Sequence, residues 1–446
     1  MQGRRGGKTT QAATRDGVTT MKKMMFAAVA GMLALGAIGC EEEVKKGPPP
    51  EPQFELPGSS PLALTKTIRG VELWPTATVV DGHGARLAEK AASADTLVVY
   101  EQLSSEYVMA RTAVFADAKL ENRLEDVFAE PKLTDAMAGY GRKVFVVDPL
   151  RLDQTWIVDA SRGTRGDAAG RESFLNFGDA GYREDAATRI VSAIADAGVI
   201  PEAVVIGSEM ERYYLLNPND WLNFASFYLE VRSAIKASFP TVQVAVGINW
   251  SNFMESVAPK FIIPEADAAG CAADAECGAG SYCAASQCGE LDFVAVQAAW
   301  QAVIDPVTFD AVTATPLTDF YAFASIPNGA LYSGNPDALP DTHYAGIPTM
   351  FREEPARKLP VRWFRIGWDV TGDSETPVKF LSRFEALNGS GYDVALVSWF
   401  GFVRQLTGDC NVIRGTLHAR PEVCQRGFYT SSGAPAGSLG ASYFAD

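Results

Sequence analysis

The chain has 446 residues, of which 47% are hydrophobic and 21% are charged, which is sufficient for a large folded core. Its formal net charge is -15 at pH 7. A chain this acidic is repelled by nucleic acid and by anionic membrane surfaces, so neither is expected to bind it through charge.

Residues 1–40 predict a leader followed by a lipoprotein signal peptide. Met21 and two lysines precede the apolar run 24–38, and small residues lead from that run to Cys40. This order of charged, apolar and small residues is typical of a secretory signal. Residues 1–20 are polar and basic, so we expect that the true start is Met21. The apolar run is shorter than the roughly 20 residues that a membrane span requires.

The end of this segment resembles the lipobox of bacterial lipoproteins, with Ala37 in place of the usual leucine. The resemblance implies a mature chain that begins at a lipidated Cys40; a plain signal peptide or a short anchor helix is the alternative. Residues 41–62 are rich in Glu, Lys and Pro and predict a disordered tether. We therefore expect an exported protein that contacts the cell-envelope membrane through its N-terminal lipid only, with the choice between inner and outer membrane left open.

Six cysteines remain once Cys40 is set aside. Four of them lie within residues 268–290, at Cys271, Cys277, Cys283 and Cys288. Their spacing resembles small Cys-rich modules in secreted proteins of myxobacteria and their relatives, which implies two local disulfides of unassigned connectivity. Zinc is the rival interpretation, but no histidine is near and the compartment of an exported protein oxidises thiols. Cys410 and Cys424 are expected to pair near the C-terminus.

Eight short apolar or β-branched segments predict strands that are buried on both faces. In chain order they span residues 68–74, 96–103, 143–149, 203–206, 242–248, 319–327, 361–368 and 393–399. Helical segments are expected between most of them, at residues 87–94, 132–141, 179–198, 221–235, 291–303 and 376–388. The alternation predicts an α/β fold, a (β/α)8 TIM barrel over residues 63–446 with a small disulfide-rich insertion. No Gly-x-Gly-x-x-Gly follows the first strand, and no cofactor is expected.

The fourth strand leads directly into Gly207, Ser208 and Glu209. It resembles strand four of the large clan of retaining glycoside hydrolases with (β/α)8 barrels (clan A), in which the strand ends in Gly-Asn-Glu. The resemblance implies that Glu209 is the catalytic general acid/base. It would lie at the carboxyl end of the barrel, where the active sites of this fold are built. Ser208 stands where the clan has asparagine.

The seventh strand departs from the same pattern. Ile366, Gly367 and Trp368 match the last three positions of the clan's Glu-x-Gly-Trp run, but Arg365 occupies the position of the nucleophile. A cation beside Glu209 would lower the pKa of that carboxyl and keep it ionised. Arg365 and Glu209 could form an ion pair across the barrel mouth, and the standard double displacement is disfavoured.

A second carboxylate could come from elsewhere in the chain. Asp369, just past the seventh strand, is the first choice as catalytic partner of Glu209, and Glu101, Asp148 and Glu211 are the other candidates. Retaining enzymes hold their two carboxyl groups about 5–5.5 Å apart, and inverting enzymes about 6.5–9.5 Å apart. Each of these residues could equally be a structural or solvated carboxylate.

Several aromatic residues fall at or near the predicted strand ends and suit stacking on the C–H face of a sugar. The candidates are Trp250, Tyr321, Trp368 and Trp399. Trp399 matches a tryptophan that stacks on sugar in many members of the clan. Arg365 completes the candidate substrate-binding set. For the aromatic residues the alternative is a place in the barrel core.

Other chemistries have less support. The three histidines, His83, His343 and His418, are far apart in sequence and form no zinc-binding spacing, so no metal is expected. We expect a cell-envelope lipoprotein similar to clan-A glycoside hydrolases that acts on a polysaccharide or other glycan. The alternatives are a catalytically inactive protein that binds glycan, and a surface protein that binds other proteins through its Cys-rich module and long loops.

Overall fold

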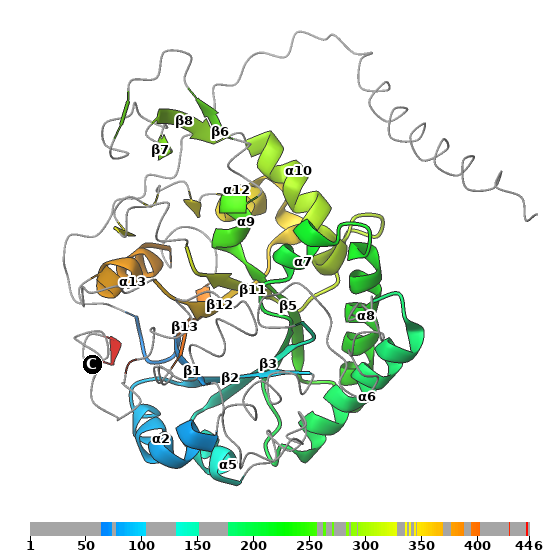
Figure 1. The fold of residues 1–446 in the computed structure, drawn as a ribbon, viewed down its shortest axis with the longest axis vertical. Helices are drawn as coiled ribbons and strands as arrows, with labels where there is room; N and C mark the ends of the chain where they lie inside the picture. The colour runs from blue at the N-terminus through cyan, green and yellow to red at the C-terminus, as the bar shows by residue number, and fades with distance from the viewer. Residues whose placement is uncertain are drawn as a thin grey trace, which may run out of the picture. The chain divides into compact units, whose positions relative to one another are not determined.

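The computed structural model describes the barrel strands and the helices around them (Figure 1). The described residues are 64–73, 77–103, 131–150, 177–256, 262–264, 270–271, 282–284, 287–291, 293–327, 335–336, 339, 343–344, 346–368, 376–387, 394–401, 428 and 443–444. Within these ranges no helix is long and apolar enough to cross a lipid bilayer. The predicted signal peptide, the tether, Cys40, Cys410 and Cys424 lie outside the described residues.

Eight parallel strands form a closed barrel. They are β1 (Arg69–Leu73), β2 (Thr96–Gln102), β3 (Arg142–Asp148), β4 (Ala203–Ile206), β5 (Gln243–Asn249), β11 (Tyr321–Ser325), β12 (Val361–Ile366) and β13 (Val394–Trp399). Neighbours in the barrel follow chain order, and the last strand closes the ring on the first, with Arg69 beside Val397. The predicted (β/α)8 barrel is therefore confirmed, and each of its strands lies within a few residues of the predicted bounds.

Two small antiparallel sheets stand apart from the barrel. A three-stranded sheet is formed by β6 (Ile262–Pro264), β7 (Tyr282–Ala284) and β8 (Gln287–Leu291), and β9 (Phe309–Asp310) pairs with β10 (Thr315–Pro316). Strand β6 precedes the Cys-rich segment, and β7 and β8 lie in its C-terminal part. Cys271 and Cys288 of that segment are each disulfide-bonded. The side chains of Cys277 and Cys283 lie outside the described ones, so the pairing within the insertion stays a prediction.

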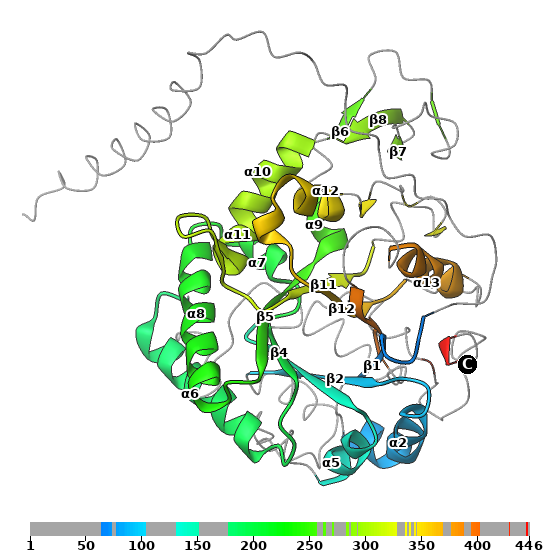
Figure 2. The same ribbon diagram turned by 180° about the vertical axis from the view of Figure 1, so that it is seen from behind.

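Helices surround the strands in both views (Figures 1 and 2). They are α2 (Ala77–Lys90), α5 (Pro131–Ala138), α6 (Ala180–Asp196), α7 (Met210–Leu216), α8 (Trp221–Ser238), α9 (Trp250–Ser256), α10 (Phe293–Val303), α11 (Asp305–Thr308), α12 (Gly346–Glu353) and α13 (Thr376–Leu387), with a 3-10 turn at Pro355–Arg357. The helices predicted near residues 132–141, 179–198, 221–235, 291–303 and 376–388 are confirmed.

The predicted bounds of one helix were wrong, and several short helices were not predicted. The helix predicted at residues 87–94 begins earlier, at Ala77, and ends at Lys90, because the chain turns at residues 91–93 to enter β2. The elements α7, α9, α11 and α12 were not predicted. Each of these helices has only four to eight residues, too few to show a helical period.

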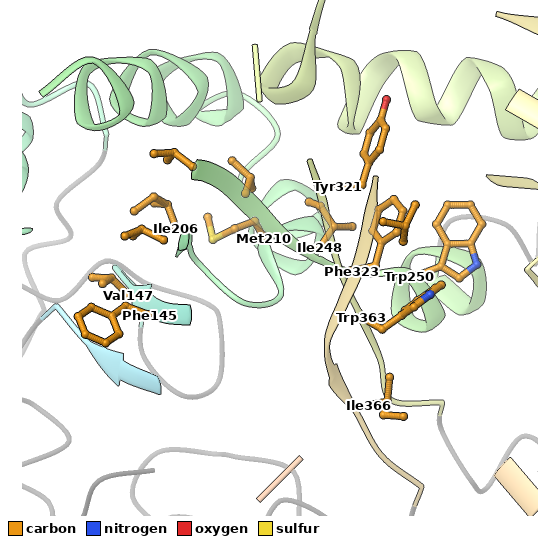
Figure 3. Packing of buried hydrophobic residues seen from close by; sticks show 14 of the residues in the cluster. Phe145, Val147, Ile206, Met210, Ile248, Trp250, Tyr321, Phe323, Trp363 and Ile366 are labelled. Carbon is orange, nitrogen blue, oxygen red and sulfur yellow. The ribbon is translucent and has the colours of Figure 1, made fainter. Parts of the chain in front are cut away.

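The buried apolar residues form two layers, one on each side of the strands. Side chains alternate along a strand, so Val98 on β2 lies inside the barrel while Val99 faces the helices. Figure 3 shows part of the outer layer, where the ring of Phe323 lies 5.5 Å from that of Trp250 and 5.6 Å from that of Trp363. This alternation decides which residues can reach a site inside the barrel mouth.

Two glycines shape the turn that follows β4. Gly207 has a φ of 75°, in the left-handed region that favours glycine. A Cβ added at Gly247 on the neighbouring strand β5 would lie 2.3 Å from the carbonyl oxygen of Gly207. The chain therefore passes close over β5 as it leaves β4, and this path places Ser208 and Glu209 at the carboxyl end of the barrel.

Candidate active site at the carboxyl ends of the barrel strands

Glu209 lies between the end of β4 and the first residue of α7, at the barrel end where all eight strands finish. Its side chain is 13% exposed, and its Oε2 lies 3.9 Å from Nη1 of Arg212, which is three residues further on. Of the other described carboxylates at this end, Glu255 on α9 is half-buried, and those on the barrel strands and on α7 are nearly or fully buried: Glu72, Glu101, Asp148 and Glu211. Among the carboxylates of the described strand ends and of α7, Glu209 thus keeps the most contact with solvent.

Glu211 follows in the first turn of α7 and is fully buried. Its Oε2 accepts a hydrogen bond from the backbone N–H of Asn249 at 2.8 Å, and its Oε1 accepts one from Nδ2 of Asn252 at 2.7 Å. Burial, together with the nearby charge of Glu209, raises the pKa of Glu211 from 4.5 to about 8, although the two hydrogen bonds oppose the change. A buried carboxyl with this pKa holds a proton at neutral pH.

Asn249, the last residue of β5, offers a further polar group close to Glu211. Its side-chain oxygen accepts long hydrogen bonds from the backbone N–H groups of Asn252, at 3.3 Å, and Ile326, at 3.4 Å. Its Nδ2 is buried and has no hydrogen-bond partner in the described part of the structure. Leaving a buried donor unpaired costs about 1–3 kcal/mol, so Nδ2 is an unsatisfied donor in the buried surroundings of Glu211.

Arg365 does not pair with Glu209 as the sequence had suggested; its carboxylate partner is Glu72 on β1. Nε of Arg365 lies 2.9 and 3.1 Å from the two carboxylate oxygens of Glu72, and Nη2 lies 2.6 Å from Oε1. The side chains of this pair are 4% and 0% exposed. Burial would lower the pKa of Arg365, but Glu72 and, less strongly, Glu209 outweigh it and raise that pKa.

The guanidinium of Arg365 is also enclosed by aromatic rings inside the barrel. It lies 4.4 Å from the ring centroid of Tyr100 and 4.9 Å from that of Phe400. The β12 register shifts between Trp363 and Ile366 relative to β13, and Arg365 lies within this irregular stretch. Arg365 is therefore a cation that the protein itself neutralises, and its contact with substrate stays a prediction.

A hydrogen-bonded chain joins the ends of β2, β3 and β4. The hydroxyl of Tyr100 donates to Oδ2 of Asp148 at 3.0 Å, and the hydroxyl of Ser208 donates to the same oxygen at 2.5 Å. The backbone N–H of Leu150 donates to Oδ1 of Asp148 at 3.1 Å. Burial and the charge of Asp148 raise the pKa of Tyr100. Asp148 thus orients both hydroxyl groups, and Ser208 serves as a hydrogen-bond donor to it.

The four aromatic residues predicted to bind sugar are all core residues: Trp250, Tyr321, Trp368 and Trp399. Each belongs to the layer between barrel and helices. Tyr321, for example, stacks on Phe323 at 5.5 Å (Figure 3). The predicted exposed aromatic surface is therefore not formed by these residues, because their positions direct the side chains outward from the barrel axis.

Asp369, the predicted second carboxylate, lies outside the described residues, so its role as catalytic partner of Glu209 stays a prediction. Among the residues that the structure describes, no group of three or more His, Cys, Asp or Glu side chains is arranged to hold a metal ion. The fold brings Glu209, Arg365 and Glu211 to one end of the barrel.

Glu72 was not predicted as a site residue, although its place in the sequence is informative. Glu72 is a carboxylate inside an otherwise apolar segment, at a position that faces the barrel interior. A charge buried there requires an opposite charge from another strand. The sequence contains no information on which strand supplies it, since Arg365 is 293 residues away.

No protein-family model and no curated protein sequence matches the chain. Several solved structures resemble it at low identity. An endo-1,4-beta-D-mannanase from Thermotoga petrophila RKU-1 shares 13% identity over 75% of this chain and 88% of that one, with a TM-score of 0.45. An exo-beta-1,4-mannosidase from Opitutaceae bacterium strain TAV5 shares 12% identity over 84% of this chain and 58% of that one, with a TM-score of 0.48. The GH53 catalytic domain of Ignisphaera aggregans shares 11% identity over 86% of this chain and 98% of that one, with a TM-score of 0.47.

Proposed function

We propose that the protein acts on a polysaccharide or other glycan at the carboxyl ends of its barrel strands, with Glu209 as the working carboxyl group. One observation carries this proposal. The carboxylates of the neighbouring strand ends and of α7 are buried in contacts with the protein, whereas the Glu209 side chain keeps a solvent-facing surface within electrostatic range of the cation Arg365. A carboxyl group placed in this way can engage a glycosidic bond or a sugar hydroxyl.

Arg365 and Glu72 restrict the chemistry that is available. A retaining mechanism needs a second carboxylate about 5–5.5 Å from the first. At the position where that carboxylate is expected stands Arg365, which binds the carboxylate of Glu72. Glu72 is fully buried and neutralised by that arginine, which makes it a poor nucleophile. Hydrolysis by direct attack of water, with Asp369 as the second carboxyl group, is the mechanism that we propose.

Glycan binding without hydrolysis is the second candidate function. The buried Arg365–Glu72 pair favours it, because it replaces a catalytic carboxylate by a contact internal to the protein. In that case Glu209 would hold sugar hydroxyl groups and no bond would be broken. We further propose that the protein is exported and anchored to the cell envelope by a lipid on Cys40, as the sequence of the leader predicts.

Replacement of Glu209 by Gln tests both functions. Hydrolysis is measured against a panel of polysaccharides, and binding is measured on a glycan array. The Glu230→Gln variant, at an exposed glutamate of α8 that pairs with Arg183, is the matched control. A loss of hydrolysis of about 100-fold or more in Glu209→Gln, with binding retained, supports the enzyme. Binding without hydrolysis in the wild type supports the second function, and hydrolysis unchanged in Glu209→Gln removes Glu209 from the mechanism.

A further inference from the structure

Glu209 and Glu211 form a carboxyl pair across the end of β4 and the start of α7. They are two residues apart, and the charge of Glu209 acts on Glu211. Two ionised carboxylates at such a separation repel each other, and the repulsion grows where water is excluded. Glu209 retains solvent contact, whereas Glu211 has none. The negative charge is therefore better placed on Glu209.

We propose that Glu211 is a positioning residue that retains a buried proton and leaves Glu209 as the charged member of the pair. The burial of Glu211 and the nearby carboxylate of Glu209 favour this division. Its two oxygens accept hydrogen bonds from Asn249 and Asn252, which fix the carboxyl plane. Taken alone these bonds favour the ionised form, but they supply no positive charge, and burial together with Glu209 outweighs them. Burial of an ion without a cation is costly, and the group keeps its proton instead.

The charged groups around Glu211 are consistent with this assignment. On its own segment are Glu209 and Arg212, and Arg212 lies beside Glu209. The helix α7 packs against β5 and α9. There β5 contributes the neutral Asn249, while α9 contributes Glu255, a further carboxylate, which is half-buried. The cation Arg365 acts on Glu209 from β12 but is already paired with Glu72.

The division of charge deepens the proposed function, and its meaning for catalysis rests on that function. An ionised Glu209 accepts hydrogen bonds from sugar hydroxyl groups and can take up a proton, whereas a neutral Glu209 would donate one. At neutral pH the pair carries one proton, on Glu211, and one negative charge, on Glu209. Glu209 therefore meets its ligand as an acceptor. This differs from the general-acid role that the resemblance to clan-A enzymes implies for the start of the reaction.

Infrared difference spectroscopy of the full chain tests the inference without any substrate. The wild type is expected to show a protonated-carboxyl band at pH 7 that disappears in Glu211→Gln and persists in the control Glu230→Gln. The band should be lost as the pH rises through about 8. Circular dichroism verifies that each variant is folded. Absence of a band at pH 7 that depends on Glu211 would overturn the inference.

Glu209→Gln supplies an independent arm in which Glu211 is unchanged. Removal of the neighbouring charge should lower the pH at which the Glu211 band is lost by about one unit or more. A midpoint that stays the same in this variant would show that the two carboxyl groups do not act as a pair. Neither arm of this experiment involves a glycan. A lack of hydrolytic activity would therefore contradict the proposed enzymatic function without contradicting the protonation of Glu211.

Discussion

The two ends of the barrel each hold an arginine from the same strand, in different surroundings. Arg365 lies near the carboxyl end of β12, and Arg362 lies near its amino end. Both guanidinium groups lie over an aromatic ring, at 4.4 Å from the centroid of Tyr100 and 4.3 Å from that of Phe320, respectively. Each arginine also binds one carboxylate. The ends therefore share a chemical arrangement and can be compared directly.

The carboxylates differ in their contact with water. Glu72, the partner of Arg365, is fully buried, whereas Glu202, the partner of Arg362 at 2.6 Å, is 32% exposed. Burial lowers the pKa of Arg362 in spite of Glu202, while Glu72 holds the pKa of Arg365 above its usual range. If the arginine is removed, water can hydrate Glu202 at the amino end but cannot reach Glu72 at the carboxyl end. Removal of the arginine is therefore expected to cost more stability at the carboxyl end, beside the candidate site, than at the amino end.

The largest expected effect comes from Arg365→Met. It leaves Glu72 as an uncompensated charge in the barrel interior, and the free energy of unfolding should fall by about 3–5 kcal/mol. Chemical denaturation measures this loss. The double variant Glu72→Gln/Arg365→Met removes both charges and should recover a large part of it. A loss below about 1 kcal/mol in the single variant would mean that water reaches Glu72 and that the two ends are alike.

Gly247→Ala tests the packing of the carboxyl end rather than its charge. The added Cβ meets the backbone oxygen of Gly207, and overpacking of this kind costs about 1–3 kcal/mol. Because Gly207 leads into Glu209, the variant should also disturb the candidate site. Gly84→Ala on α2 is the control, since a Cβ there meets nothing within 4 Å. Equal stability of the two variants would contradict the close passage of the β4 turn over β5.

Arg362→Met, at the amino end, should cost less than Arg365→Met, about 1 kcal/mol after allowance for the exposure of Glu202. Its effect should shrink further in high salt, because salt screens an ion pair that water can reach. Thermal unfolding at low and high ionic strength measures both quantities. If the losses for the two arginine variants are equal and equally insensitive to salt, the contrast between the ends is wrong.

The two ends should also respond to pH in opposite directions. At the carboxyl end the folded pKa of Glu211 lies above the unfolded value of 4.5, so the folded state binds more protons and stability falls as the pH rises towards about 8. At the amino end the pKa of Asp319 is lowered, since Lys236 and the backbone N–H of Val244 outweigh burial. Its contribution is present above pH 3.8 and is lost as the pH falls below it.

Melting temperatures measured from pH 3 to pH 9 separate the two groups. Glu211→Gln should flatten the dependence between pH 4.5 and about 8 and leave the acidic limb intact. Asp319→Asn should flatten the acidic limb and leave the dependence between pH 4.5 and about 8 intact. Its effect is the smallest of those considered, because Asp319 retains solvent contact. A change in the same limb for both variants would contradict the assignment of these residues to separate ends.

The barrel was predictable because its strands are short, apolar on both faces and separated by helical segments, and each of these signals is local. The position of Glu209 was predictable for the same reason, since it directly follows the apolar run of β4. The orientation of the aromatic side chains was not predictable. Trp399 and Tyr321 stand on predicted strands, but whether they face the barrel axis or the helices depends on the side to which each strand presents them. A slip of one residue reverses that side.

The sequence by itself determined the fold class and the place of Glu209 at the end of the fourth strand, because apolar runs and their spacing specify which segments become buried strands. Only the tertiary structure decided which charges meet. Arg365 is bound by Glu72 from the first strand, and Glu211 is enclosed by Asn249 and Asn252. Closing the barrel brings strands that are distant in the chain together, and the loss of water there fixes the partner of each charge and the proton on each carboxyl group.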